Sequence, residues 1–258
     1  MNFLVSCLTA THGRWSWVRE AITCFIVQDY ENKELLILNN HPVRLICNLP
    51  QVRVFNEPFY PTLGDCRNRL LELASGEFVR TWDDDDLYLP WAISQGVKMI
   101  EDAPAWKPKR SWFSTKNKEY TLNENVYEAS ITFRTDFAKK YGYQRSGGDE
   151  HNPLMFALQK ERCKIDEMGI WASYIYRWDT PLWRISGSLG SDTIENRTRD
   201  WKEKNNEHGD EKPLTPASLS SYWRDLNFAI KEEFNEENPV LSRYDEVDRL
   251  SSQPTSAP

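Results

Sequence analysis

Apolar residues in the first hundred positions follow two different periods. Four short apolar runs have the length of strands, and they lie at 3–10, 34–40, 52–56 and 77–82. In three other stretches an apolar residue recurs every three or four positions, the period of a helix, at 15–29, 63–73 and 90–100. Strands and helices that alternate over such short links are typical of a parallel sheet covered by helices. The pattern therefore predicts an α/β fold.

The second half of the chain is less regular. Aromatic and β-branched residues with polar interruptions fill 110–134, which favours antiparallel strands. We expect short helices within 135–143 and 147–162 and a last strand at 170–178. The chain then becomes polar and charged before one further apolar helical face. This organisation predicts a domain at 1–186 with halves 1–100 and 101–186, a charged and helical extension at 187–245, and a disordered tail at 246–258.

Composition and charge narrow the class of protein. The 258 residues carry a net charge of −7, and 40% of them are hydrophobic, as in globular proteins. No run of about 18 apolar residues is present, so no membrane span is expected. The five cysteines are never spaced as C-x-x-C, and the N-terminal apolar stretch lacks a basic flank. Both features favour a cytoplasmic protein with reduced thiols over a secreted one.

Four consecutive aspartates, Asp83–Asp86, directly follow the predicted strand at 77–82. Polar segments also follow the first and second strands, at 10–14 and 39–42. Because ligands of parallel α/β sheets bind outside the carboxyl ends of the strands, the three segments should converge. Adjacent carboxylates repel unless a cation joins them, and Mg²⁺ or Mn²⁺ prefers oxygen ligands. A solvated acidic turn before the next helix is the alternative, but the position at a strand end favours a metal and phosphate site.

Four segments resemble, in the same order, motifs of the inverting family 2 glycosyltransferases. They are VSCLTATHGR at 5–14, QDYENKELLILNN at 28–40, GDCRNRLLELASGEFVRTWDDDDLYLP at 64–90 and ASITFRTDFAKKYGY at 129–143. The chain looks like the small soluble phage and bacterial members. The resemblance implies the GT-A fold, a Rossmann-like and mostly parallel central sheet flanked by helices, with a smaller antiparallel part. The helical C-terminal extension is predicted from the apolar spacing alone. The motifs themselves do not extend into the C-terminal part of the chain.

The resemblance implies separate roles for the aspartates. Asp83 and Asp85 fall on the two acids of the family's DxD motif, and Asp85 would bind the Mn²⁺ or Mg²⁺ that bridges the sugar-nucleotide diphosphate. Asp83, or else Asp84, would hold the ribose or a metal-bound water. Asp86 would cap the following helix. Thr11 falls in the family's nucleotide loop and is expected near the base or ribose, with an N-cap of the next helix as the alternative.

The same resemblance points to four further nucleotide-sugar contacts. Arg67 matches the family's Arg-Asn motif and would face the nucleotide, whereas an exposed helix arginine is the alternative. Asn39 and Asn40 stand where the family usually has two aspartates. An asparagine oxygen can accept the uracil N3–H and its amide can also donate, so a UDP-sugar is favoured while another base stays open. Arg184, after the last predicted strand, is a candidate diphosphate contact.

An inverting transferase also needs a general base beside the acceptor hydroxyl. In the family it is an acid that opens a helix after a glycine loop, and SGGDEHNPL at 146–154 occupies that place. Asp149 and Glu150 are the candidates, and Glu150 aligns with the motif's second acid. The alternative is an acidic helix N-terminus without a catalytic role.

Together these features predict a metal-dependent inverting glycosyltransferase that moves a sugar from a nucleotide sugar to an acceptor hydroxyl. The acceptor would belong to a glycan or glycolipid, or to a hydroxymethylated pyrimidine of phage DNA. A nucleotidyltransferase and a nucleotide-sugar-binding module that has lost its activity are the alternatives. The protein is expected in the cytoplasm, which would be the host cytoplasm if a phage encodes it.

Overall fold

Two sheets organise the computed structural model, which describes residues 2–12, 14–57, 60–114, 120–125, 127–146, 149–166 and 172–177. Within these residues the larger sheet has seven strands in the order β10-β6-β9-β4-β1-β2-β3. In chain order they are β1 Val5–Thr11, β2 Lys33–Asn39, β3 Val52–Asn56, β4 Phe78–Thr81, β6 Ala105–Pro108, β9 Thr132–Arg134 and β10 Lys164–Asp166. The smaller sheet runs in the order β5-β11-β7-β8, with β5 Leu87–Tyr88, β7 Arg110–Ser114, β8 Tyr120–Glu124 and β11 Tyr174–Arg177.

The pairing in the larger sheet is mostly parallel. β1 pairs in parallel with both β2 and β4, and β2 pairs in parallel with β3. β9 is the exception, because it lies antiparallel between β4 and β6. In the smaller sheet β7 and β8 form the antiparallel pair expected within 110–134. The predicted α/β class, with a mostly parallel sheet and a smaller antiparallel part, is confirmed.

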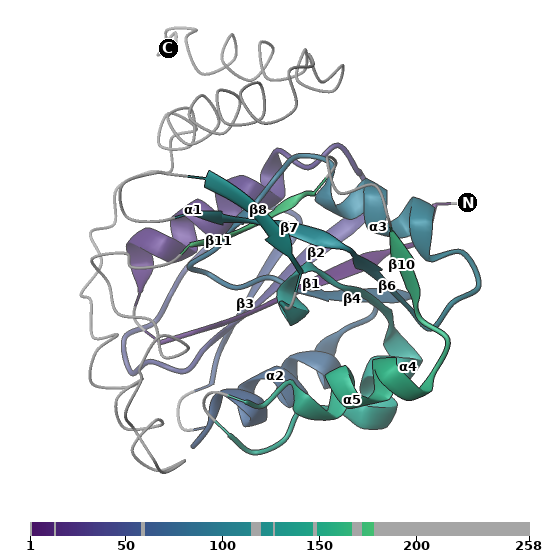
Figure 1. Ribbon diagram of the computed structural model, residues 1–258. Helices are drawn as coiled ribbons and strands as arrows, with labels where there is room; N and C mark the ends of the chain where they lie inside the picture. Colours follow the sequence, from purple (N-terminus) through teal and green to yellow (C-terminus); the bar gives the residue numbers. More distant parts are fainter. Residues whose placement is uncertain are drawn as a thin grey trace, which may run out of the picture.

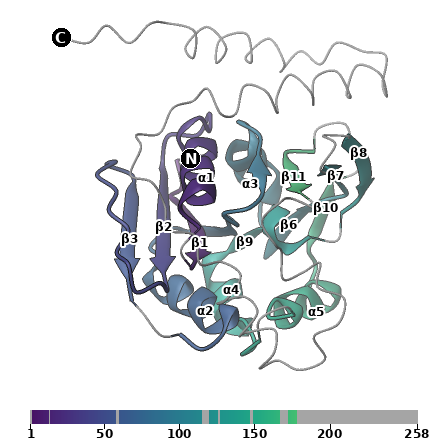
Figure 2. The same cartoon turned by 90° about the vertical axis from the view of Figure 1, so that its left-hand side faces the viewer.

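Helices cover both faces of the larger sheet (Figures 1 and 2). One face carries α1 (Trp15–Ile26) and α3 (Ala92–Ile100), and the other carries α2 (Leu63–Leu73), α4 (Thr135–Tyr141) and α5 (Asn152–Lys160). Buried apolar residues divide in the same way into two cores. Along β2, Ile37 belongs to the α1 core, whereas Leu36 and Leu38 belong to the α2 core, because side chains alternate along a strand. In the part of the chain that is described, no helix combines the length and the apolar character that crossing a membrane requires.

Several short elements differ from the pattern-based expectation. The strands β5, β6 and β10 were not predicted, and each has two to four residues. The helix expected from residue 90 begins at Ala92, and the last expected strand is the shorter β11. The predicted extension at 187–245 and tail at 246–258 lie outside the described residues.

One charged residue lies where the strand pattern expects an apolar one. Arg80 on β4 has none of its surface exposed, and its Nη1 donates to the backbone oxygen of Ala92, 2.5 Å away. Its Nε and Nη2 have no hydrogen-bond partner among the described residues, and its guanidinium lies 5.9 Å from the ring centre of Tyr88. Burial lowers the pKa of Arg80 below its ordinary value. The α1 core therefore contains an ionisable group to which no carboxylate of the described residues is bonded.

Candidate active site

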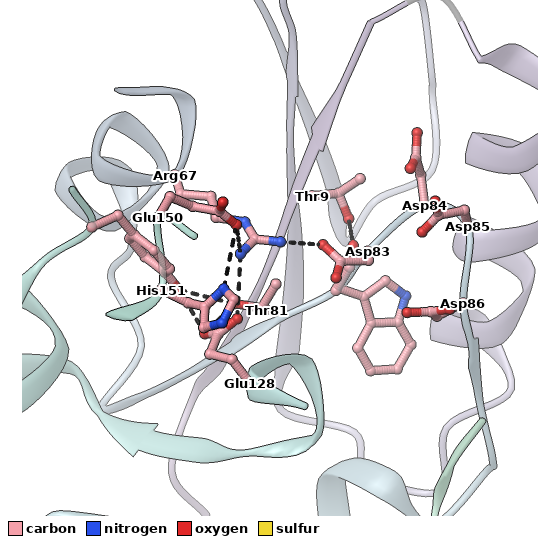
Figure 3. A network of polar contacts seen from close by, with 12 residues as sticks. Thr9, Arg67, Thr81, Asp83, Asp84, Asp85, Asp86, Glu128, Glu150 and His151 are labelled. Carbon is pink, nitrogen blue, oxygen red and sulfur yellow. Dashed lines mark hydrogen bonds and ion pairs between the residues drawn. The ribbon is translucent and has the colours of Figure 1, made fainter. Parts of the chain in front are cut away.

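The carboxyl ends of β1, β2 and β4 form one edge of the larger sheet, as the sequence predicts. Thr11 at the end of β1 is in register with Asn39 at the end of β2. The backbone N–H of Trp82 donates to Leu8 on β1, and Thr9 Oγ1 donates to the backbone oxygen of Trp82 at 2.6 Å. These bonds extend β4 by one residue and place Asp83 at the same edge (Figure 3). The acidic loop, defined as Asp83–Asp86, therefore starts beside the nucleotide-loop candidate Thr11.

Exposure alternates along the acidic loop. The residues Asp84 and Asp86 are 1% and 2% exposed. The side chains of Asp83 and Asp85 are 29% and 15% exposed. Asp84 accepts a 2.7 Å hydrogen bond from the Thr11 hydroxyl and forms an ion pair with Arg14. The two more exposed aspartates are therefore the two that fall on the DxD positions, and Asp84 stabilises the loop from inside.

Two predicted helix caps are wrong. Asp86 does not cap α3, whose N-cap is Trp91 without a side-chain bond. Its carboxylate instead accepts hydrogen bonds from the Tyr174 hydroxyl and from the backbone N–H of Arg177, because β5 and β11 pair beside it. Thr11 does not cap α1 either, since the N-cap is Arg14 and the Thr11 hydroxyl is bound to Asp84. The Thr11 hydroxyl therefore binds the acidic loop, the Asp86 carboxylate binds β11, and neither caps a helix.

Two arginines that the motif comparison did not single out hold this loop. Arg14 Nη1 lies 2.9 Å from Asp85 Oδ2, and its other terminal nitrogen contacts Asp84. Arg177 donates from Nε to the backbone oxygen of Asp85 at 2.7 Å and pairs with Glu20 on α1 at 2.6 Å. Part of the positive charge that the aspartates require is thus supplied by arginine. Repulsion among the four aspartates therefore does not by itself require a metal ion, which corrects the reasoning from the sequence.

Arg67 on α2 is buried, with 6% of its surface exposed, so the alternative of an exposed helix arginine is wrong. Its Nη2 lies 2.6 Å from Asp83 Oδ1, and its Nη1 lies 2.6 Å from Glu150 Oε1. The same Nη1 is 3.4 Å from an oxygen of Glu128, in the 3₁₀ helix η1 (Glu128–Ser130). Figure 3 shows Arg67 between Asp83 on one side and the two glutamates on the other. We call these four residues the Arg67 cluster.

Glu128 was not predicted from the sequence. It accepts 2.7 Å hydrogen bonds from the hydroxyls of Thr81 and Tyr143 and is 5% exposed. The Tyr143 ring also lies 5.4 Å from the Arg67 guanidinium. No motif marks Glu128, because its partners come from β4, α2 and the segment after α4, which are distant in sequence.

Glu150 has the properties of an ionised base with an available oxygen. It is 4% exposed, and Oε2 has no hydrogen-bond donor among the described residues. Burial acts to raise the pKa of Glu150, but the charge of Arg67 and the contact with His151 hold it below its ordinary value. His151 Nδ1 lies 3.8 Å from Oε1, and its imidazole pKa is raised because the pull of Glu150 outweighs burial. A buried carboxylate oxygen without a donor can accept one from a ligand.

The side chain of Asp149, the other candidate base, forms its hydrogen bond within its own turn. Its carboxylate accepts from the Ser146 hydroxyl, and its backbone oxygen accepts from Gln144 Nε2 and from the N–H of Asn152. The first turn of α5 contains no acidic residue, so the alternative of an acidic helix N-terminus is not found. The geometry therefore favours Glu150 over Asp149.

The turn that holds Glu150 packs against the start of α2 at a glycine. A Cβ atom added to Gly64 would lie 1.8 Å from the backbone oxygen of Gln144 and 3.1 Å from Cβ of Glu150. The Gly64 N–H also donates to the backbone oxygen of Ser146 at 3.0 Å. Only glycine allows this approach, which brings Glu150 within reach of Arg67.

Asn39 and Asn40 are buried at the same edge, and their side chains organise the loops there. Asn39 Nδ2 donates to Asn56 Oδ1 at 2.7 Å and to the backbone oxygen of Val43 at 2.9 Å. Asn40 forms a pair of 2.9 Å hydrogen bonds with the backbone of Tyr60. The Asn40 N–H also donates to the backbone oxygen of Thr11. The structure thus brings together Thr11, Asn39 and Asn40, while Arg184 lies outside the described residues.

The acidic loop offers the type of ligand that a hard divalent cation prefers, but it offers too few ligands to hold the cation alone. Carboxylate oxygens are the ligands that Mg²⁺ and Mn²⁺ prefer. Within the described parts of the chain, no three His, Cys, Asp or Glu side chains are grouped so as to hold a metal ion. Burial raises the pKa of Asp83 to about 7 against the pull of Arg67, and repulsion from Asp85 adds to it. Asp83 and Asp85 therefore fit a cation whose other ligands come from a phosphate-containing substrate.

Residues 6–157 match the family model described as Glycosyl transferase family 2. A search of curated proteins gave no match. The fold resembles residues 1–349 of S. aureus TarS in complex with UDP-GlcNAc, with a TM-score of 0.55 and 14% identity, covering 95% of this chain and 70% of that one. It also resembles the mannosyltransferase PcManGT from Pyrobaculum calidifontis in complex with GDP-Man and Mn²⁺, with a TM-score of 0.51 and 13% identity, covering 98% and 81%. These comparisons confirm the predicted GT-A fold.

Proposed function

The chain belongs to glycosyl transferase family 2, and from this premise we propose that it transfers a sugar from a nucleotide sugar with inversion, using Glu150 as the general base. Family membership makes the protein a glycosyltransferase and argues against the nucleotidyltransferase alternative. Inversion, metal dependence, the nucleotide and the acceptor are the proposed parts. They rest on the residues gathered at the carboxyl edge of the larger sheet.

The observation that carries the proposal is Oε2 of Glu150, which has no hydrogen-bond donor in the part of the chain that the structure describes. Its partner oxygen Oε1 is held by Arg67 at 2.6 Å, so the carboxylate is ionised and oriented. An acceptor hydroxyl that donates to Oε2 would satisfy it and lose its proton there. The acceptor oxygen would then attack the anomeric carbon on the face opposite the nucleotide. The bond from that carbon to the diphosphate breaks, and the nucleoside diphosphate leaves with the electron pair.

The acidic loop is proposed to hold the donor. Asp85 and Asp83 are the accessible acids and would bind Mn²⁺ or Mg²⁺ together with the diphosphate. The bound ion would neutralise the charge of the leaving group. Thr11 and Asp84 would lie near the ribose, with Asp84 acting through the hydroxyl that it already binds. Loss of catalysis by Asp85→Asn with retained folding is the expected signature.

A UDP-sugar remains the favoured donor. TarS was crystallised with UDP-GlcNAc, whereas PcManGT was crystallised with GDP-Man, so the shared fold accepts more than one base. The side chains of Asn39 and Asn40 already bond to Asn56, Val43 and Tyr60. Uracil would therefore be recognised by the loops that these asparagines position, including their backbone groups, and not only by the asparagine amides. Arg184 remains a predicted diphosphate contact.

The acceptor is proposed to be a glycan or glycolipid hydroxyl or the hydroxymethyl group of a modified pyrimidine in DNA. Both offer the hydroxyl that Glu150 requires. The predicted cytoplasmic location, including a host cytoplasm, is compatible with either one. Binding to DNA that disappears at moderate salt would support the nucleic-acid acceptor, and absence of DNA binding at low salt would exclude it.

A donor screen tests the proposed function. UDP-, GDP- and CDP-sugars are incubated with the protein and Mn²⁺, Mg²⁺ or EDTA, and release of the nucleoside diphosphate is measured. We expect turnover of UDP-sugars that requires the metal and is lost in Asp85→Asn, while thermal stability is kept. Product formed from an α-linked donor should carry a β linkage by NMR. Full metal-dependent turnover by Asp85→Asn, or retention of the α configuration, contradicts the proposal.

A further inference from the structure

The guanidinium of Arg67 joins two acids that the proposed reaction uses separately. Asp83 belongs to the donor side and Glu150 to the acceptor side, and each is 2.6 Å from a different terminal nitrogen of Arg67. A guanidinium is planar and rigid, so two carboxylates bound to it are held at a fixed separation. Moving either carboxylate therefore requires breaking a buried, charge-assisted hydrogen bond.

Burial makes Arg67 hard to replace. Arg67, Glu128 and Glu150 are all less than 9% exposed, so water contributes little to their solvation. Glu128 is already held by the hydroxyls of Thr81 and Tyr143, whereas Glu150 has no such neutral donor among the described side chains. Without the guanidinium, the carboxylate of Glu150 would be a buried charge left with the more distant His151.

We propose that Arg67 is a positioning residue for the general base: it fixes Oε1 of Glu150, links Oε1 to Asp83 on the donor side, and leaves Oε2 for the acceptor hydroxyl. This inference rests on the proposed function of Glu150. It differs from the sequence-based expectation that Arg67 faces the nucleotide. Its basis is the geometry of the Arg67 cluster, in which the hydrogen bonds of the guanidinium to described residues go to the carboxylates of Glu128, Glu150 and Asp83.

The groups around Glu150 determine what removal of Arg67 should do. Arg67 faces it from α2, Glu128 from η1 and His151 from the start of α5, and Asp83 is linked to it through Arg67. With Arg67 present, the pKa of Glu150 lies below its ordinary value. Without Arg67, burial and the nearby carboxylate of Glu128 both favour the protonated acid, and His151 and a backbone hydrogen bond at Glu150 oppose them. The base would then be protonated at neutral pH.

A titration of Glu150 itself tests this inference without any substrate. The protein is labelled with ¹³C at the glutamate carboxyl carbons, and the resonance that disappears in Glu150→Gln is followed from pH 4 to pH 9.5. We expect the Glu150 carboxyl of the wild type to be ionised throughout most of this range. In Arg67→Met its midpoint should move upward by about 3–5 pH units, as for a fully buried acid without a counter-ion. An unchanged midpoint would overturn the proposal.

Two further variants keep the test conclusive. Arg69→Met is the matched control on the same helix, because Arg69 is partly exposed and pairs with Glu57 and Glu72 outside the cluster. It should leave the Glu150 midpoint unchanged. If Arg67→Met does not fold, the double variant Arg67→Met/Glu128→Gln removes one excess buried charge and is titrated instead. A low midpoint in the folded double variant would overturn the proposal as well.

Activity gives the second readout. In Arg67→Met, kcat at pH 7 should fall by about tenfold or more and recover toward pH 9, while KM for the donor changes less. Arg67→Lys, which keeps a charge but cannot bridge two carboxylates, should fall between the wild type and Arg67→Met. A kcat that is reduced equally at all pH values would contradict a role through Glu150. If the wild type transfers no sugar at all, the proposed function fails, whereas the titration still decides whether Arg67 controls Glu150.

Discussion

Replacement of Glu150 by glutamine removes the proposed base with the smallest change of shape. Proton transfer by a positioned base contributes about 10²- to 10⁴-fold to a rate, which corresponds to about 3–5 kcal/mol in the activation free energy. We therefore expect kcat for sugar transfer to fall by at least about 100-fold. Binding of the nucleotide, which we propose to involve the acidic loop and not Oε2, should be unchanged.

The effect of Glu150→Gln on stability follows from its contacts. The amide oxygen can still accept from Arg67 at the position of Oε1, which is 2.6 Å from the guanidinium nitrogen. The amide nitrogen would replace Oε2, which lies in a buried position without a hydrogen-bond partner among the described residues. Such an unpaired donor costs about 1–3 kcal/mol. This cost is partly offset, because the negative charge near Glu128 is removed, so we expect a modest decrease of Tm.

The assay separates chemistry from binding. Transfer is followed as nucleoside diphosphate released in the presence of acceptor, and nucleotide affinity is measured by calorimetry. Glu161→Gln is the matched control, since Glu161 at the end of α5 is partly exposed and contacts Lys140 and Tyr141. A kcat of Glu150→Gln within tenfold of the wild type, with the control unchanged, would refute the assignment of the base.

Four other predictions follow from individual contacts. Asp84→Asn should lower the free energy of unfolding by about 2 kcal/mol or more in urea denaturation, because it weakens a buried ion pair. Asp85→Asn should lower that value by less, because the Asp85 side chain is 15% exposed and that of Asp84 is 1% exposed, and equal losses in the two variants would contradict the alternation of exposure. Gly64→Ala should lower kcat along with Tm, since the added Cβ meets the backbone at 1.8 Å and displaces the Glu150 turn. Wild-type kcat in a folded Gly64→Ala protein would argue against this. His151 has a raised pKa, so the stability it contributes is present below its unfolded pKa and is lost as pH rises through the folded one. His151→Asn should therefore be less stable than the wild type at pH 5.5 and nearly equal at pH 8.5, and a constant difference in urea midpoint would contradict it. Arg80→Met should keep or raise Tm, because it removes a buried cation that bonds only to a backbone oxygen among the described residues, and a clear decrease would indicate an unseen partner.

The sequence predicts the frame of this fold because its long elements have clear periods. β1 and β2 each contain a short run of mostly apolar residues, as expected for strands buried on both faces, and α2 repeats apolar residues at helical spacing. The strands β5, β6 and β10 escape prediction because two to four residues cannot establish a period. β5 has a further consequence, since its pairing with β11 turns Asp86 away from α3.

The candidate site was predictable only where a motif marks it. The acidic loop and Glu150 could be located from their place after a strand and after a glycine loop. Arg14, Glu128 and Arg177 could not, because their partners are 15 to 157 residues away along the chain. Such pairs depend on how the sheet is assembled and leave no local pattern. The motifs therefore indicate which acids are present, whereas the buried arginines determine which of them remain accessible.

The Arg67 cluster has a consequence for how such enzymes can diverge and be recombined. Arg67 and Asp83 come from the first hundred residues, whereas Glu128 and Glu150 come from the part that follows. A chimera that joins the first hundred residues of one relative to the following part of another thus combines Arg67 from one parent with Glu128 and Glu150 from the other. Parents that differ at any of these four positions would give a folded sheet in which the buried cation and the buried carboxylates no longer match. Exchange of the part that follows the first hundred residues should therefore give a stable protein mainly between chains in which these four positions match.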